Sequence, residues 1–259
     1  MKYLLLVGIL FYGYFAHALA HRQGAWSSLK LGARYSSVLQ RRGVVLYGDF
    51  QIDPIISAYF LDDKLEFFGD ALSYRDFLFT SESIRYRVMA SSLSDNPLFP
   101  SNSAIKSNYV DRENTYEVSA GLEFFLASYD KDYWGEFDIS YAKDIKAHNG
   151  YYLSAQSKIK ISEMELFHKK VEPHAVVRIG LGDEKHNRYL YGPTANGDGL
   201  NNWAYGFVFE FPEDADRLIP VIQLMRFETL GEERRNAAFA KDHNEGFLLS
   251  FLGTINFLN

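Results

Sequence analysis

Aromatic and aliphatic side chains recur at every second position along this chain, and this alternation constrains the fold more than any other feature. The clearest run comprises Trp203, Tyr205, Phe207, Phe209 and Phe211. A second run has the same spacing at Tyr133, Gly135, Phe137, Ile139 and Tyr141. A period of two is the signature of a β-strand with two unlike faces. Repeated through an exported chain, it predicts an all-β fold, a transmembrane antiparallel up-and-down β-barrel whose outer face meets lipid.

The alternation and the turn residues between the runs predict about twelve strands. They cover Leu29–Tyr35, Gly43–Gln51, Ile55–Leu61, Lys64–Asp76, Ile84–Ala90, Tyr116–Leu126, Tyr133–Tyr141, Tyr151–Ile161, Glu165–Gly182, Trp203–Phe211, Leu218–Glu228 and Phe247–Phe257. The ninth strand is interrupted by Pro173. An even number of strands is what single-chain bacterial barrels have.

Loop lengths predict how the barrel is oriented. Three long polar stretches follow the fifth, ninth and eleventh strands, at Ser91–Asn114, Asp183–Asn202 and Gly231–Glu245. Short turns follow the sixth, eighth and tenth strands. Outer-membrane barrels have long outer loops and short periplasmic turns, so the pattern predicts that both termini are periplasmic.

The N-terminus predicts export. Met1-Lys2 is followed by an apolar stretch from Tyr3 to Phe15 and by the small-x-small end Ala18-Leu19-Ala20. This is the pattern of a signal peptide over residues 1–20, with the barrel over residues 21–259. The alternative is an N-terminal membrane anchor, although the apolar stretch is short for a spanning helix. The 0 Cys exclude a lipoprotein anchor, disulfides and thiolate metal sites.

Charged residues share one face of many predicted strands, and we expect this face to line the lumen. The set is Lys30, Arg34, Arg85, Arg87, Glu117, Glu123, Glu136, Asp138, Lys158 and Lys160. Because the fifth and sixth strands form a hairpin, the two arginines are expected to pair with Glu117 and Glu123. The rival fold is a soluble periplasmic sandwich or lipocalin-like barrel, with its apolar face turned inward. The net charge of -6 without a basic stripe argues against nucleic acid as a partner.

Three segments resemble the MipA/OmpV family of outer-membrane proteins (MltA-interacting proteins). The first is RRGVVLYGDFQIDPIISAYFLDDKLEFFGDALSYR, Arg41–Arg75, with Pro54, Phe67-Phe68 and Gly69 in the family's pattern. The others are AKDIKAHNGYYL, Ala142–Leu153, and RYLYG, Arg188–Gly192. The resemblance implies a barrel in the outer membrane of a Gram-negative envelope. It also implies a scaffold role toward a lytic transglycosylase and a peptidoglycan synthase, and it supplies no catalytic motif.

We therefore expect a non-enzymatic scaffold, with outer-membrane lipid as a partner and no catalytic, cofactor or metal site. One alternative is a porin-like channel for small solutes, because about twelve strands enclose a narrow or plugged lumen. A second is a lipid-modifying barrel enzyme that uses Ser154 with His168 or His174.

Four loop histidines and acids, His148, His186, Asp144 and Asp183, are expected to be solvated rather than to bind a metal. We expect a flexible loop at Gly192–Gly199, because it lacks a phosphate-loop lysine and the ligand order of a calcium loop. The charged run Glu232–Arg235 is expected to be a solvated loop or a short helical turn.

Overall fold

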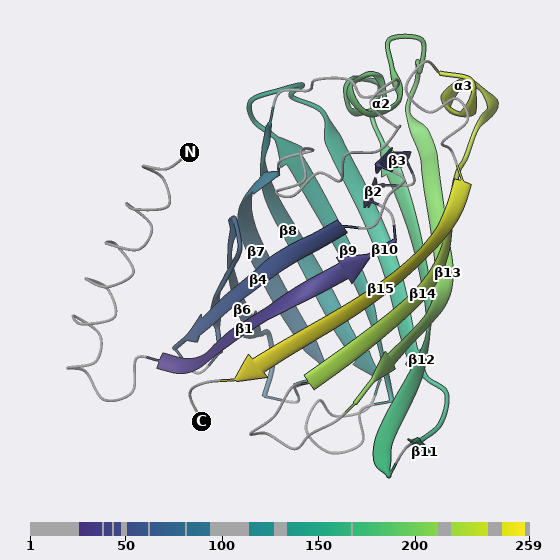
Figure 1. Ribbon diagram of the computed structural model, residues 1–259. Coiled ribbons are helices and arrows are strands. Elements are labelled where there is room, and N and C mark those ends of the chain that lie inside the picture. Colours follow the sequence, from purple (N-terminus) through teal and green to yellow (C-terminus); the bar gives the residue numbers. More distant parts are fainter. Residues whose placement is uncertain are drawn as a thin grey trace, which may run out of the picture.

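A computed structural model of the 259-residue chain describes residues 26–37, 39–42, 44–47, 51–61, 63–80, 82–93, 114–126, 134–166, 168–211, 219–237 and 245–256. These residues form a closed ring of strands with a small hairpin inside it and two short helices at one end (Figure 1). No helix in the described ranges is long and apolar enough to span a bilayer. The predicted signal peptide, residues 1–20, lies outside the described residues.

Twelve strands of the described chain make the wall. They are β1 (Trp26–Ser36), β4 (Gln51–Phe60), β5 (Leu65–Phe68), β6 (Ala71–Phe77), β7 (Ile84–Leu93), β8 (Thr115–Leu126), β9 (Gly135–Asp144), β10 (Tyr151–Lys160), β12 (Lys169–Gly182), β13 (Gly199–Glu210), β14 (Ile219–Thr229) and β15 (Glu245–Asn256). Each pairs antiparallel with the next wall strand along the chain, and β15 pairs with β1 to close the ring. The predicted up-and-down barrel is confirmed.

The two faces of the wall are divided as the alternation predicted. Outward side chains such as Ile139, Tyr205 and Phe207 are exposed on the outer surface. Cross-strand register places Arg85 opposite Glu123, and Glu123 opposite Asp138, on the lumenal face. All ten charged residues predicted to line the lumen occupy this face by register. The alternative of a soluble sandwich with an apolar interior is therefore wrong.

The predicted second strand, Gly43–Gln51, is not a wall strand. Val44–Tyr47 forms β3, which pairs with β2 (Leu39–Arg41) in a separate two-stranded sheet. The chain turns back at Arg42, whose φ of 48° is left-handed. Alternation reports two unlike faces, and an inserted hairpin has such faces just as a wall strand does.

The predicted fourth strand, Lys64–Asp76, is instead two wall strands, β5 and β6. They are joined at Gly69-Asp70, where Gly69 has a φ of +58° that favours glycine. The wall therefore still has twelve strands, because the division adds one strand and the inserted hairpin takes one away.

The ninth predicted strand continues through Pro173. Residues on β12 with odd numbers direct their backbone groups toward β10, as shown by the bond from Ile161 N–H to Pro173 C=O. Pro173 thus lies where β10 has just ended at Lys160, so its missing N–H costs no bond within the ladder. The short strand β11 (Met164–Leu166) pairs with the start of β12 beyond the ring.

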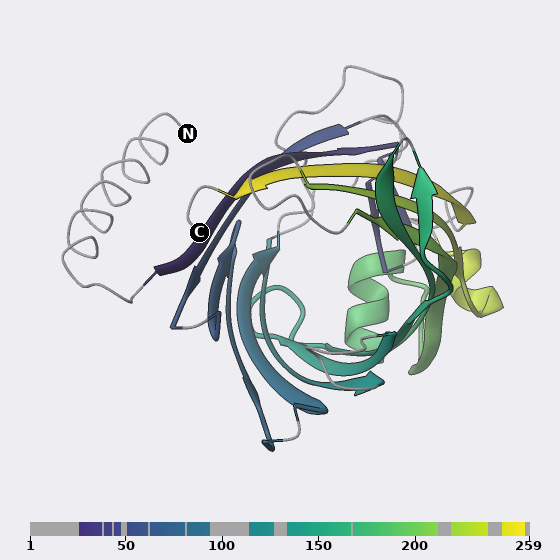
Figure 2. The same cartoon turned by 90° about the horizontal axis from the view of Figure 1, so that it is seen from below.

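The two ends of the barrel differ. The helices α2 (Glu184–Tyr191) and α3 (Glu232–Arg235) lie at one end, which the loop lengths predict to be the outer end, and α2 falls within the outline of the ring when viewed along the barrel (Figures 1 and 2). The start of β1, the end of β15 and the β11 hairpin lie at the other end, which is the predicted periplasmic end. The short helix α3 is the helical turn predicted for Glu232–Arg235.

Two neighbouring residues on β14 test the assignment of faces. Leu224 is exposed on the outer face, whereas Gln223 lies on the lumenal face opposite Ser250. We expect Leu224→Arg to lower the free energy of unfolding in lipid by about 2–4 kcal/mol, because the cation would enter hydrocarbon. Gln223→Arg is the matched control and should cost much less. Urea unfolding in phospholipid vesicles measures both, and equal costs would contradict the orientation.

Candidate functional site: a latched hairpin across the lumen

Ion pairs cover the lumenal wall on β7 and β8. Arg85 Nε lies 2.5 Å from Glu123 Oε2, and Arg87 Nη1 lies 3.3 Å from Glu123 Oε1. These are pairs that the sequence predicted between the two strands. Glu117 differs, because its carboxylate binds Arg42, which comes from the inserted hairpin.

The β2–β3 hairpin leaves the wall directly after β1. Ser37 anchors its start, since Ser37 N–H donates to Leu249 C=O at 2.9 Å and Leu249 N–H donates to Ser37 Oγ at 3.0 Å. From β15 the hairpin reaches across to side chains of β8, β10 and α2. The segment between β1 and β4 therefore crosses the barrel near the end that carries α2.

Arg42, at the tip of this hairpin, is held from four directions. Its Nη2 donates to Glu117 Oε2 at 2.7 Å, and its Nη1 donates to His186 Nδ1 at 3.2 Å. Its guanidinium carbon lies 4.1 Å from the ring centre of Tyr152, a cation–π contact. Its own C=O accepts from Tyr191 Oη at 3.1 Å. We call these five residues the latch: Arg42, Glu117, Tyr152, His186 and Tyr191.

The latch is largely shielded from water. The side chain of Arg42 is 13% exposed and that of Glu117 is 5% exposed. Charge-assisted hydrogen bonds are strong in such surroundings, and removing one partner of a buried ion pair leaves an uncompensated charge. Burial also raises the pKa of the Tyr191 hydroxyl, which therefore keeps the proton that it donates to Arg42.

The latch fixes the protonation of His186. Arginine has no acceptor, so Nδ1 of His186 must be unprotonated to accept from Arg42. The neighbouring His148 is in the same state, because its Nδ1 accepts from Gly150 N–H at 2.9 Å. The two rings meet edge to face with centres 5.4 Å apart. Both histidines are therefore neutral in this arrangement.

Helix α2 holds His186 over the lumen. Asp183 caps the helix by accepting from His186 N–H at 2.9 Å, and it also accepts from Tyr151 N–H at 3.1 Å. Asn187 donates to Gly197 C=O at 2.7 Å, which ties the helix to the loop that follows it. At Gly182 a side chain would collide with His186, Asn187 and Asn201, so only glycine allows this close approach.

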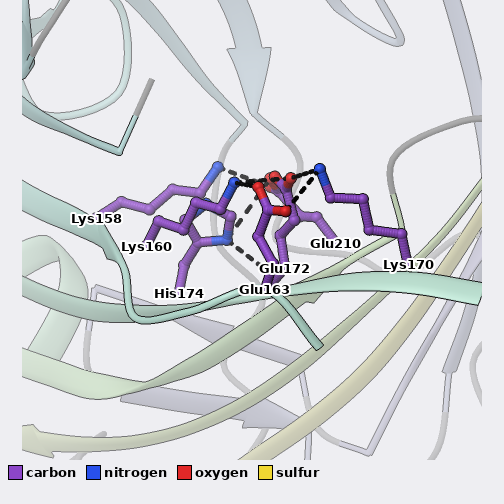
Figure 3. Close-up of polar contacts among 7 residues, drawn as sticks. All are labelled: Lys158, Lys160, Glu163, Lys170, Glu172, His174 and Glu210. Carbon is purple, nitrogen blue, oxygen red and sulfur yellow. Dashed lines mark hydrogen bonds and ion pairs between the residues drawn. The ribbon is translucent and has the colours of Figure 1, made fainter. Parts of the chain in front are cut away.

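A second polar cluster gathers side chains from the end of β10, the start of β12 and the end of β13 (Figure 3). Lys160 contacts Glu163 at 2.6 Å and Glu172 at 2.8 Å, while Lys170 contacts the same two carboxylates at 3.0 and 3.1 Å. Lys158 binds Glu210 at 2.7 Å. Hydrogen bonds from Lys160 and Lys170 lower the pKa of the Glu163 carboxyl. Three lysines face three glutamates, so the charges within this cluster compensate one another.

The structure separates the proposed serine and histidine of a barrel enzyme. Ser154 pairs in register with Gly180, six residues along β12 from His174, which is about 20 Å. Ser154 Oγ instead shares a hydrogen bond with Ser140 Oγ at 2.7 Å. His168 is fully exposed at the periplasmic end. These residues do not meet.

The expectation that the loop histidines and acids are solvated is wrong for His186 and Asp144, which are both 1% exposed. Asp144 accepts from the N–H groups of Tyr116, His148 and Asn149. Its role is to satisfy backbone donors at the outer end of β9. Within the described ranges, no group of three or more His, Asp or Glu side chains is arranged to hold a metal ion.

The predicted flexible loop Gly192–Gly199 packs against α2. Besides the bond from Asn187, Asn196 Oδ1 accepts from Arg188 and Asp198 Oδ1 accepts from Glu184 N–H. The loop thus helps to seat the helix that carries His186.

Sequence reasoning missed Arg42, the centre of the latch. The available signal was Arg41-Arg42-Gly43, a charged pair with a turn residue set inside an apolar stretch. Its partners lie 75 and 144 residues away, so no local spacing pointed to them.

Comparison with known proteins gives structural similarity alone. No protein-family model matches the chain, and no curated protein matches it. A structure of the COG4313 outer membrane channel from Pseudomonas putida F1 aligns over 91% of this chain and 97% of that chain, with 9% identity and a TM-score of 0.37. CarO from Acinetobacter baumannii aligns over 88% and 97%, with 10% identity and a TM-score of 0.21. Ail of Yersinia pestis aligns over 91% and 100%, with 11% identity and a TM-score of 0.17. The resemblance to the MipA/OmpV family stays a prediction.

Proposed function

We propose that this protein is an outer-membrane barrel that conducts small polar solutes, through a lumen that the β2–β3 hairpin closes toward the outside. The latch carries this proposal. A hairpin that crosses the lumen and is held at its tip by one arginine is an arrangement that can open. Twelve strands enclose a space between that of filled eight-stranded barrels and that of open sixteen-stranded porins.

The lining favours solutes that are small and polar. Arg85 on β7, Glu123 on β8 and Gln156 on β10 face the lumen, and Arg85 and Glu123 compensate each other's charge. The lipid-facing outer wall and the polar interior support an outer-membrane location. Because Ser154 lies far from His174, we also infer a non-enzymatic role.

Removing the arginine of the latch should open the lumen. Arg42→Ala loses the ion pair, the bond to His186 and the cation–π contact together, and of the latch contacts it keeps only the bond from Tyr191 to the backbone C=O at position 42. We expect a several-fold rise in mean conductance in planar bilayers. Heat-modifiable migration on gels verifies that each variant is folded.

Arg226→Ala is the matched control, because Arg226 pairs with Glu228 and Glu245 on the outer face. It should conduct like the parent. If folded Arg42→Ala is as silent as the parent, or the parent already conducts as a wide pore, the proposed closure by the hairpin is contradicted.

Acid should open the same latch. Histidine ordinarily titrates between about pH 5 and 8, and a protonated His186 would present a donor and a positive charge to Arg42. Around His186 lie Arg42, Tyr152 and His148, with the carboxylates of Glu117, Asp144 and Asp183 one contact further out. With a proton on Nδ1, His186 and Arg42 would both be hydrogen-bond donors and cations, so their direct contact would become repulsive.

We expect conductance to rise as pH falls, and His186→Gln to remove most of that rise. Glutamine keeps an acceptor for Arg42 but does not titrate. His168→Gln, at an exposed periplasmic histidine, is the control and should retain the response. An unchanged pH response in His186→Gln would show that another group controls opening.

The scaffold role implied by the MipA/OmpV resemblance remains a second candidate, and one observation favours it. The β11–β12 hairpin projects beyond the ring at the periplasmic end, with Met164 exposed among charged side chains. Methionine is enriched in protein–protein interfaces, and the rims of such interfaces are polar. A lytic transglycosylase or a peptidoglycan synthase would reach this end of the barrel from the cell wall.

Capture from detergent extracts tests this role, with a cell-wall hydrolase or synthase as bait. We expect Met164→Glu to reduce capture, because the apolar contact would be lost. Ile145→Glu makes the same change at an exposed residue of the outer end and should be captured like the parent. Absence of enrichment for the parent protein would count against the scaffold role.

A further inference from the structure

Among the residues that the structure describes, the wall has a notch beside the first half of β4. This strand pairs with β1 from Gln51 to Phe60, but it pairs with β5 only from Ser57 to Phe60. Above that point the β5–β6 hairpin has already turned at Gly69-Asp70. Its last bonds are from Gly69 N–H to Ile56 C=O and from Ser92 N–H to Asp70 C=O. Among the described residues, nothing pairs with the free side of β4 from Gln51 to Ile55, a length of about 17 Å.

The free edge has a defined set of polar groups. In an antiparallel strand, residues alternate in the side to which they direct their N–H and C=O groups. Ile56 directs its C=O away from β1, so Ile52 and Pro54 do the same. The edge therefore offers one N–H, from Ile52, and two C=O groups, from Ile52 and Pro54. It is rich in acceptors because proline has no N–H.

Two further observations show that the space is open. Ile52 is 56% exposed, whereas Ile139, which faces outward between two paired strands, is 39% exposed. A side chain built at Gly69 would meet no atom within 4 Å. The flanks are apolar, since Ile52, Ile56 and Leu72 are all exposed on the outer face.

An open strand edge is not tolerated in hydrocarbon unless it lines a water-filled space or binds a polar group. A docking β-strand would need a regular ladder, and Pro54 interrupts that ladder at its centre. A partner strand is therefore disfavoured. An amphiphile fits better, because its chain would lie against the apolar flanks while its head donates hydrogen bonds to the two C=O groups.

We propose that the notch is a lateral binding and exit site for single-chain amphiphiles with hydroxyl head groups, between the lumen and the bilayer. Such a site gives a solute with an apolar chain a route into the bilayer that needs no opening of the hairpin. The proposal rests on the proposed function only in taking the lumen to hold water.

The full-length protein in phospholipid vesicles gives the test. Since the chain has 0 Cys, Ile52→Cys can carry a single fluorophore at the notch, and Ile139→Cys carries the same label on a fully paired wall. The probe is a brominated monoacylglycerol at low mole fraction. We expect it to quench the label at position 52 about fivefold more strongly than the label at 139, the enrichment that one net hydrogen bond gives.

A brominated two-chain phospholipid should quench both labels equally, and a brominated fatty acid, whose carboxylate is an acceptor, should show less preference for position 52. Equal quenching by the monoacylglycerol at both positions would overturn the proposal. If Ile52→Cys does not fold, Leu72→Cys on the other flank takes its place. Quenching requires no conductance, so this result and that of Arg42→Ala can fail independently.

Discussion

The fold depends on one constraint, that every backbone N–H and C=O within the bilayer needs a partner. A closed antiparallel ring meets it, because each wall strand has two neighbours and β15 returns to β1. The prolines respect the same constraint. Pro173 directs its nitrogen toward the end of β10, and Pro54 directs its nitrogen toward the notch, so in both places the absent N–H would have had no partner in the ladder. Neither residue interrupts a ladder that the ring requires.

The closed ring determines on which face of the wall ionised side chains can lie. The period of two forces half of each strand inward, and an ionised side chain on the other half would meet lipid. The lumen therefore contains more ionised groups than a soluble core would accept, and they are arranged as compensating pairs such as Arg85 with Glu123. Arg42 completes this arrangement from the inserted hairpin, because it forms an ion pair with Glu117 on β8.

The sequence predicted what depends on local pattern. The outward faces, the lumenal charges and the pair of Arg85 with Glu123 follow from alternation and from hairpin adjacency. The inserted hairpin was missed because Val44–Tyr47 alternates like a wall strand, and the pattern does not say which surface its apolar face meets. The division at Gly69 was missed because the apolar residues on both sides read as one run.

The latch was the least predictable element, since contacts across 75 and 144 residues follow from the closed ring and not from spacing. The free energy that holds the latch closed determines whether the hairpin can open. Breaking a buried ion pair by deleting one partner costs about 3–5 kcal/mol, because a bare charge is left behind. If the hairpin moves away within a water-filled lumen, water solvates both Arg42 and Glu117. The free energy needed to separate the two side chains is then smaller than the cost of deleting one of them. A gap of a few kcal/mol keeps the open state at roughly 0.1–10%. Protonation of one histidine is a perturbation of the size needed to shift such a balance, whereas it would be too small to unfold a barrel in which each wall strand is paired with two neighbours.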